Sequence, residues 1–136
     1  MPSTGYTMNL FTVAGVSPAN ATTYYVGAEI NDGGNTSYPV ARIEIPKFGR
    51  LRRVSLKVRV GGTLGSNQSV QHFIRINDAS DVAEIDAAYN TTTQDLHNTT
   101  VSQTVTPGDF VALKIVAPNW TITPGNVRWS CLLYIE

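Results

Sequence analysis

The sequence predicts an all-β domain built from about eight short strands. Apolar and polar residues alternate through most of the chain, which is the pattern of strands with one face on a core and one face in water. Clusters of Gly, Asn, Asp and Pro separate these runs, and such residues supply the positive or fixed φ angles that turns need. Helical periodicity is nearly absent. Together these observations predict an antiparallel two-sheet β-sandwich or a barrel in one domain of 136 residues.

The clearest strand is the run from Arg53 to Val60, in which Val and Leu alternate with Arg, Ser and Lys. The segment Ala79–Ala88 is short and fits either a helix or an alternating strand, and we interpret it as a strand. In chain order the expected strands cover Thr22–Ile30, Tyr38–Ile45, Arg53–Val60, Val70–Asn77, Ala79–Ala88, Thr99–Val105, Phe110–Ala117 and Val127–Ile135.

Composition excludes several classes of partner. The formal net charge is zero, so no global field attracts nucleic acid or an anionic membrane. Charged residues make up 15% of the chain, below the usual value of about 25%, and Ser, Thr, Asn and Gly supply the polarity instead. The single cysteine, Cys131, excludes an internal disulfide. The start of the chain shows no secretory leader, and no apolar run is long enough to span a membrane, so we expect a soluble product made in the host cytoplasm.

Two expected strands are apolar on both faces. In the Phe110–Ala117 run, Phe110, Ala112, Lys114 and Val116 form the face opposite Val111, Leu113 and Ile115. In the last run, Leu132 and Tyr134 point away from Trp129, Cys131, Leu133 and Ile135. Because a sandwich buries only one face of each sheet, the second face needs another partner, and a further copy of the chain is the simplest. Coverage by loops of the same chain is the alternative. The basic Arg53–Val60 strand is expected in a sheet that faces water.

The order of four segments resembles the small jelly-roll domains of tailed-phage virions. These segments are "ARIEIPKFGRLRRVSLKVRV", "HFIRINDAS", "TVTPGDFVALKIVAP" and "NVRWSCLLYIE". The family includes head-decoration (cement) proteins and fibre knobs, and it is similar in outline to the trimeric C1q and tumour-necrosis-factor jelly rolls. The resemblance covers roughly Thr22 to Glu136 and depends on strand pattern and turn placement.

The resemblance implies a jelly-roll β-sandwich assembled as a homotrimer, with the C-terminal strand in the sheet that faces the axis. The domain would then cover residues 22–136, and residues 1–21 would form an arm that docks on the major capsid protein. The expected trimer contacts are Phe110, Lys114, Val116, Trp129, Leu132 and Tyr134. The expected docking residues of the arm are Tyr6, Met8, Leu10 and Phe11. The implied function is a non-enzymatic capsid decoration protein on the phage head.

No catalytic or cofactor-binding motif is present, so we expect no enzyme activity and no cofactor. Cys131 lies in an alternating strand, where a buried hydrophobe is the better interpretation than a reactive thiol. His72 shares a face with Val70 and Ile74, which favours a hydrogen-bonded core or interface histidine. His97 is expected in a surface loop.

An acidic cluster raises the question of a calcium site. Its members are Asp78, Asp81, Glu84 and Asp86. Calcium takes several oxygen ligands, but the spacing fits no EF-hand loop, and Asp is common in hairpin turns because its side chain bonds the local backbone. We therefore expect no metal.

Carbohydrate binding is the alternative function, as the receptor- or glycan-binding knob of a head or tail fibre. Trp120 lies in the expected loop "APNWTITPGN" and is the best candidate for a residue that stacks on a sugar. Packing of the aromatic residues at the loop ends and the rim of the sandwich is the alternative, and we favour it over sugar binding.

Overall fold

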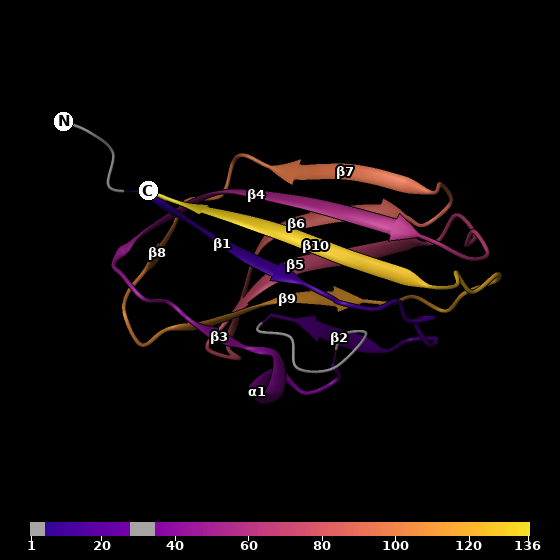
Figure 1. The fold of residues 1–136 in the computed structure, drawn as a ribbon, viewed down its shortest axis with the longest axis horizontal. Helices are drawn as coiled ribbons and strands as arrows, with labels where there is room; N and C mark the ends of the chain where they lie inside the picture. The colour runs from indigo at the N-terminus through magenta and orange to yellow at the C-terminus, as the bar shows by residue number, and fades with distance from the viewer. Residues whose placement is uncertain (1–4, 28–34) are drawn as a thin grey trace.

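A computed structural model describes residues 5–27 and 35–136 as two antiparallel sheets packed face to face (Figure 1). The first sheet has the order β1-β10-β4-β7, and β8 pairs with β4 at one end. The second has the order β2-β9-β5-β6, and β3 pairs with β9. The strands of the first sheet are β1 (Tyr6–Phe11), β4 (Gly49–Val60), β7 (Thr93–Asn98), β8 (Gln103–Val105) and β10 (Val127–Ile135). Those of the second are β2 (Thr23–Val26), β3 (Ile43–Glu44), β5 (Ser69–Ile76), β6 (Ser80–Ala88) and β9 (Phe110–Val116).

The strand order is that of a jelly roll. Apart from the β5–β6 hairpin, the chain changes sheets at each connection between the eight main strands, so neighbours within a sheet are far apart in sequence. The whole of the first strand, β1, pairs with Ser130–Ile135 of the last strand, β10, with Tyr6 opposite Ile135. The predicted fold class is therefore confirmed, including the strand interpretation of Ala79–Ala88.

The core fills the space between the sheets, and in β4, β5 and β10 it takes most of its residues from alternate positions of the strand. Strand β10 alternates strictly between buried and exposed residues along its nine positions. The largest fully buried side chains include Trp129, Leu133, Leu56, Leu113 and Ile74.

The expected arm is wrong, because its central part is a strand of the jelly roll. Residues 6–11 form β1, and the side chains of Met8 and Leu10 are buried in the core. The Tyr6 hydroxyl donates a hydrogen bond to the carbonyl oxygen of Lys47 at 2.5 Å. The domain therefore includes this segment instead of beginning at Thr22, and residues 1–4 lie outside the described residues.

Two expected strands also differ. The segment Tyr38–Ile45 contains the short helix α1 (Tyr38–Ala41) before β3, because Pro39 has no N–H to give to a sheet and its fixed φ suits the first turn of a helix. The expected strand Thr99–Val105 is shortened to β8, and β7 precedes it. His97 therefore lies in a strand and not in a loop, although its side chain is exposed. Of the expected strand Thr22–Ile30, residues 23–26 form β2, and residues 28–30 lie outside the described residues.

The basic strand and the C-terminal strand are neighbours in one sheet. Strand β10 pairs with β4 from Val127 to Ile135. The expectation that these strands belong to differently exposed sheets is wrong, and their outward side chains form one surface.

Candidate functional site

The outer surface of the β1-β10-β4-β7 sheet combines exposed apolar and basic side chains. We call this surface the β10 face. Strand register sets Phe11 beside Ser130, and Ser130 beside Lys57. Three large apolar side chains remain exposed on it: Phe11 at 45%, Leu132 at 39% and Tyr134 at 38%. Its charged side chains include Arg53, Lys57, Arg59, Asp95 and Arg128, and His97 lies beside them.

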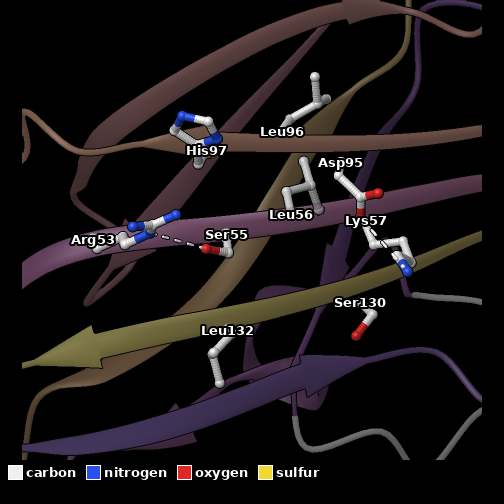
Figure 2. Close-up of a pocket in the computed structure, with 9 residues that line it drawn as sticks. All are labelled: Arg53, Ser55, Leu56, Lys57, Asp95, Leu96, His97, Ser130 and Leu132. Carbon is white, nitrogen blue, oxygen red and sulfur yellow. Dashed lines mark hydrogen bonds and ion pairs between the residues drawn. The ribbon is translucent and has the colours of Figure 1, made fainter.

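An open groove of about 410 Å³ crosses the β10 face between β10, β4 and β7 (Figure 2). The small side chains Ser55 and Ser130 line its middle, and Leu132 borders it on β10. On the β7 side, Lys57 pairs with Asp95 at 3.6 Å. This arrangement offers hydroxyl groups, one aliphatic wall and positive charge to a partner.

The six expected trimer contacts do not lie on one surface. Leu132 and Tyr134 lie on the β10 face, as expected. Trp129 instead points into the core and is 1% exposed, because it alternates with the outward residues of β10. The remaining three residues belong to β9, on the outer side of the other sheet.

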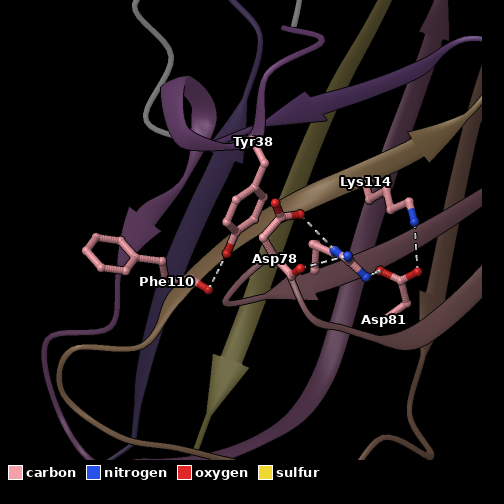
Figure 3. Close-up of polar contacts among 6 residues, drawn as sticks. Tyr38, Asp78, Asp81, Phe110 and Lys114 are labelled. Carbon is pink, nitrogen blue, oxygen red and sulfur yellow. Dashed lines mark hydrogen bonds and ion pairs between the residues drawn. The ribbon is translucent and has the colours of Figure 1, made fainter.

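Polar contacts of the same chain surround part of β9, and Figure 3 shows those of the Phe110 backbone with Tyr38 and of Lys114 with Asp81. The Arg42 guanidinium lies 4.1 Å from the centre of the Phe110 ring, and the Tyr38 hydroxyl donates to the Phe110 carbonyl oxygen at 2.7 Å. Lys114 pairs with Asp81 at 2.8 Å. The chain itself thus covers part of this face around Phe110 and Lys114, while Phe110, Lys114 and Val116 stay half-buried. These three residues do not extend the surface around Leu132.

The end of the sandwich opposite the C-terminus is built from four hydrogen-bonded loops, at the right of Figure 1. We call it the neutral loop end, because none of its residues is Asp, Glu, Lys, Arg or His; it comprises residues 12–22, 61–68, 89–92 and 117–126. The loops are joined by backbone hydrogen bonds such as Ser66 N–H to Ile122 O at 3.2 Å and Gly65 N–H to Tyr89 O at 2.7 Å. Three aliphatic side chains project from it: Val13 at 58%, Leu64 at 42% and Ile122 at 50% exposed.

Trp120 lies in one of these loops but does not offer its ring to a ligand. It is 8% exposed, and its ring packs against Tyr89 with 5.9 Å between the centroids. Its indole N–H is buried and has no hydrogen-bond partner among the described residues. The favoured interpretation, in which the aromatic residues pack at the loop ends, is confirmed for Trp120, and the loop turns the side chain away from a sugar.

A buried polar network joins three strands. The His72 Nδ1 atom lies 2.7 Å from the Ile85 carbonyl oxygen, so this nitrogen carries the proton and donates. The Nε2 atom is then an acceptor and receives the Tyr89 hydroxyl proton at 2.5 Å. The Tyr89 oxygen in turn accepts the Trp129 indole N–H at 2.7 Å. The polar side-chain groups of His72, Tyr89 and Trp129 therefore all have hydrogen-bond partners. Burial lowers the pKa of His72 to about 4 and raises the pKa of Tyr89. His72 is thus a hydrogen-bonded core histidine, as predicted.

The remaining candidates for chemistry have structural roles. Burial raises the pKa of Cys131 to about 12, so its thiol is protonated and enclosed. Asp78 and Asp81 form ion pairs with Arg75 at 3.2 and 3.1 Å. The Glu84 carboxyl shares a proton with the neighbouring Asp86 carboxylate, and this hydrogen bond, which protonated Glu84 donates, raises the pKa of Glu84.

Neither a metal site nor a membrane-spanning helix occurs in the part of the chain that the structure describes. Among these residues, no three His, Cys, Asp or Glu side chains are grouped so that they could hold a metal ion. No helix of residues 5–27 or 35–136 is long and apolar enough to cross a membrane.

Comparisons with known proteins add little to this description. No protein-family model matches the chain, and no curated protein matches it. Among solved structures, it is similar to CBM35 from Cellvibrio japonicus Abf62, with a TM-score of 0.42 and 13% identity over 94% of this chain and 92% of that chain. A likeness at this score carries no functional argument, so the fold assignment depends on the strand order given above.

Proposed function

We propose that this chain is a non-enzymatic structural protein of a bacteriophage virion, a homotrimer that decorates the outer surface of the head. The observation that carries the proposal is the group of exposed apolar side chains on the β10 face: Phe11, Leu132 and Tyr134. Monomeric proteins seldom leave neighbouring large apolar groups in water. The resemblance of the sequence to tailed-phage jelly rolls supports the virion setting and the three-fold assembly.

In this proposal the trimer contact is centred on β1 and β10. A three-fold ring is closed by a heterologous contact, in which two different patches of each copy meet. The β10 face supplies one of them. The outer sides of the two sheets point in opposite directions, and a contact between them would produce an open row instead of a ring, which argues against Phe110 and Val116 as the second patch.

Attachment to the major capsid protein is assigned to the neutral loop end, in place of the N-terminal arm. Depletion of charge and exposure of apolar side chains are features of the centre of protein interfaces, and both occur around Val13, Leu64 and Ile122. A trimer bound where capsid subunits meet would stabilise the shell, because a ligand that prefers the assembled state shifts the equilibrium toward it.

A pair of matched substitutions separates the two contacts. Light scattering coupled to gel filtration should give about 44 kDa for the wild-type protein, three times the chain mass of 14.7 kDa. Leu132→Glu should give a monomer that is still folded, because the side chain is exposed. Ile122→Glu should keep the trimer and lose binding to purified phage heads that lack the protein.

Three results would contradict the proposal. A wild-type mass near 14.7 kDa at micromolar concentration would exclude the trimer. Undiminished head binding by Ile122→Glu would exclude the neutral loop end as the docking surface. Electron microscopy of the native particle that located the protein on a fibre would favour the alternative of a fibre knob, which would have to bind glycans without Trp120.

A further inference from the structure

Two arginines face each other across β4 and β10 without an acidic partner. Arg59 and Arg128 occupy directly paired positions, and both side chains point outward on the β10 face. No carboxylate of residues 5–27 or 35–136 forms an ion pair with either of them. The nearby acid on β7, Asp95, is already paired with Lys57. Like charges directly opposite each other on neighbouring strands are destabilising, so this pair calls for a compensating anion.

The two arginines line a depression of about 160 Å³ together with Gly61 and Asn126. Asn126 has a positive φ of 51°, and its backbone oxygen accepts the Gly61 N–H at 3.0 Å. Its side-chain amide is seated between two glycines. A Cβ added at Gly15 would lie 1.6 Å from the amide oxygen, and one added at Gly61 would lie 2.6 Å from the amide nitrogen. The oxygen is therefore on the Gly15 side, and the N–H donors are on the side of Gly61 and the depression.

We propose that this depression binds a single phosphate or sulfate group. A guanidinium presents parallel N–H donors that match oxyanion geometry, and two guanidinium groups with one amide offer more donors than the two oxygens of a carboxylate can use. The volume is below the range of about 300–1,000 Å³ that is typical of pockets for larger ligands, so a nucleotide or an oligosaccharide would not be enclosed. The ligand is a free oxyanion or the terminal group of a phosphate monoester.

The site is independent of the proposed function. It lies where the β10 face, which supplies Arg59 and Arg128, meets the neutral loop end, which supplies Gly61 and Asn126, and all of its residues come from one chain. In a trimer joined through the β10 face, a bound anion would also offset the positive charge that three copies bring together. The two ideas are separated by measuring anion binding on the wild-type protein and on the Leu132→Glu variant.

Thermal unfolding in a low-salt Hepes buffer tests the site with inorganic phosphate, sulfate, glycerol 3-phosphate and acetate, each compared with sodium chloride at equal ionic strength. Phosphate and sulfate should raise the melting temperature of the wild-type protein more than chloride or acetate does. A rise in melting temperature with glycerol 3-phosphate would show that phosphate monoesters also bind, and no rise would restrict the site to free ions. Arg128→Gln and Arg59→Gln should each weaken phosphate binding by at least about tenfold, because each removes charge-assisted hydrogen bonds. Arg53→Gln, elsewhere on the same face, is the matched control, and phosphate should raise its melting temperature as much as that of the wild-type protein.

A second readout distinguishes a binding site from a general effect of salt. Without added anion, Arg128→Gln should melt no lower than the wild-type protein, because it removes like-charge repulsion. Phosphate should shift the backbone amide resonances of Gly61 and Asn126 in the wild-type protein and in Leu132→Glu. The proposal would be overturned if phosphate raised the melting temperatures of Arg128→Gln and the wild-type protein equally. It would also be overturned if phosphate raised the melting temperature of the wild-type protein no more than chloride does.

Discussion

Replacing Tyr89 by Phe tests whether the buried polar network stabilises the fold. The substitution removes one oxygen atom and leaves the ring, which is fully buried, in place. Two buried groups then lose their partner: the acceptor nitrogen of His72 and the indole N–H of Trp129. Each unsatisfied buried group costs about 1–3 kcal/mol. We therefore expect the free energy of unfolding to fall by about 3 kcal/mol, which is a large part of the about 5–15 kcal/mol that a domain usually has.

Urea unfolding followed by tryptophan fluorescence measures this loss, because Trp129 belongs to the network. Tyr134→Phe is the matched control: it removes the same oxygen from an exposed side chain and should change the free energy by less than about 0.5 kcal/mol. If Tyr89→Phe also stays within about 0.5 kcal/mol of the wild-type protein with an unchanged urea dependence, the hydrogen bonds contribute nothing net and the reasoning is refuted.

Two further predictions concern acid sensitivity and close packing. The pKa of His72 is lowered to about 4 in the folded protein, from an ordinary value of 6.5. As the pH falls, the unfolded chain therefore binds the proton before the folded protein does. The free energy of unfolding should drop by about 3 kcal/mol between pH 6.5 and pH 4. Urea titrations across this range should show a clearly shallower pH dependence for His72→Leu, and an unchanged slope would contradict the assignment. Gly27→Ala should destabilise the protein by more than about 2 kcal/mol, because the new Cβ would lie 1.9 Å from the Ala41 carbonyl oxygen. The comparison is Gly125→Ala, whose Cβ would approach no atom closer than 3.2 Å, and equal losses in urea unfolding would argue against the predicted clash.

The strands with strict alternation could be predicted from the sequence, and those without it could not. In Val54–Val60 of β4 and in β10 every second residue is apolar and buried, and in β5 only His72 departs from this. The period therefore predicts both the strand and its inner face. Strand β7 carries one inward aliphatic residue, Leu96, among polar neighbours, and such an edge strand has no apolar period to detect. Strand β1 carries the same alternation at Tyr6, Met8 and Leu10, although the resemblance implies an arm there.

The contents of the site were less predictable, because they depend on which strands become neighbours. The jelly-roll order brings β10 beside β4, and only this pairing sets Arg128 against Arg59. The network around His72 requires a register shift in the β5–β6 pair, where Ala83 takes a positive φ of 57°. The inward position of Trp120 depends on how the loops fold over one another, which no local pattern encodes.

The pairing of the first strand with the last has a practical consequence for display on a particle. Since Tyr6 lies opposite Ile135, a peptide fused after Glu136 would leave the molecule at the end far from Val13 and Ile122. Because Tyr6 and Ile135 are neighbours, a short linker could join the two ends of the domain in a circular permutant. The new termini would then lie in another turn, such as Asn77–Ala79. Cargo could then be carried on either terminus without blocking the surface that we assign to the shell.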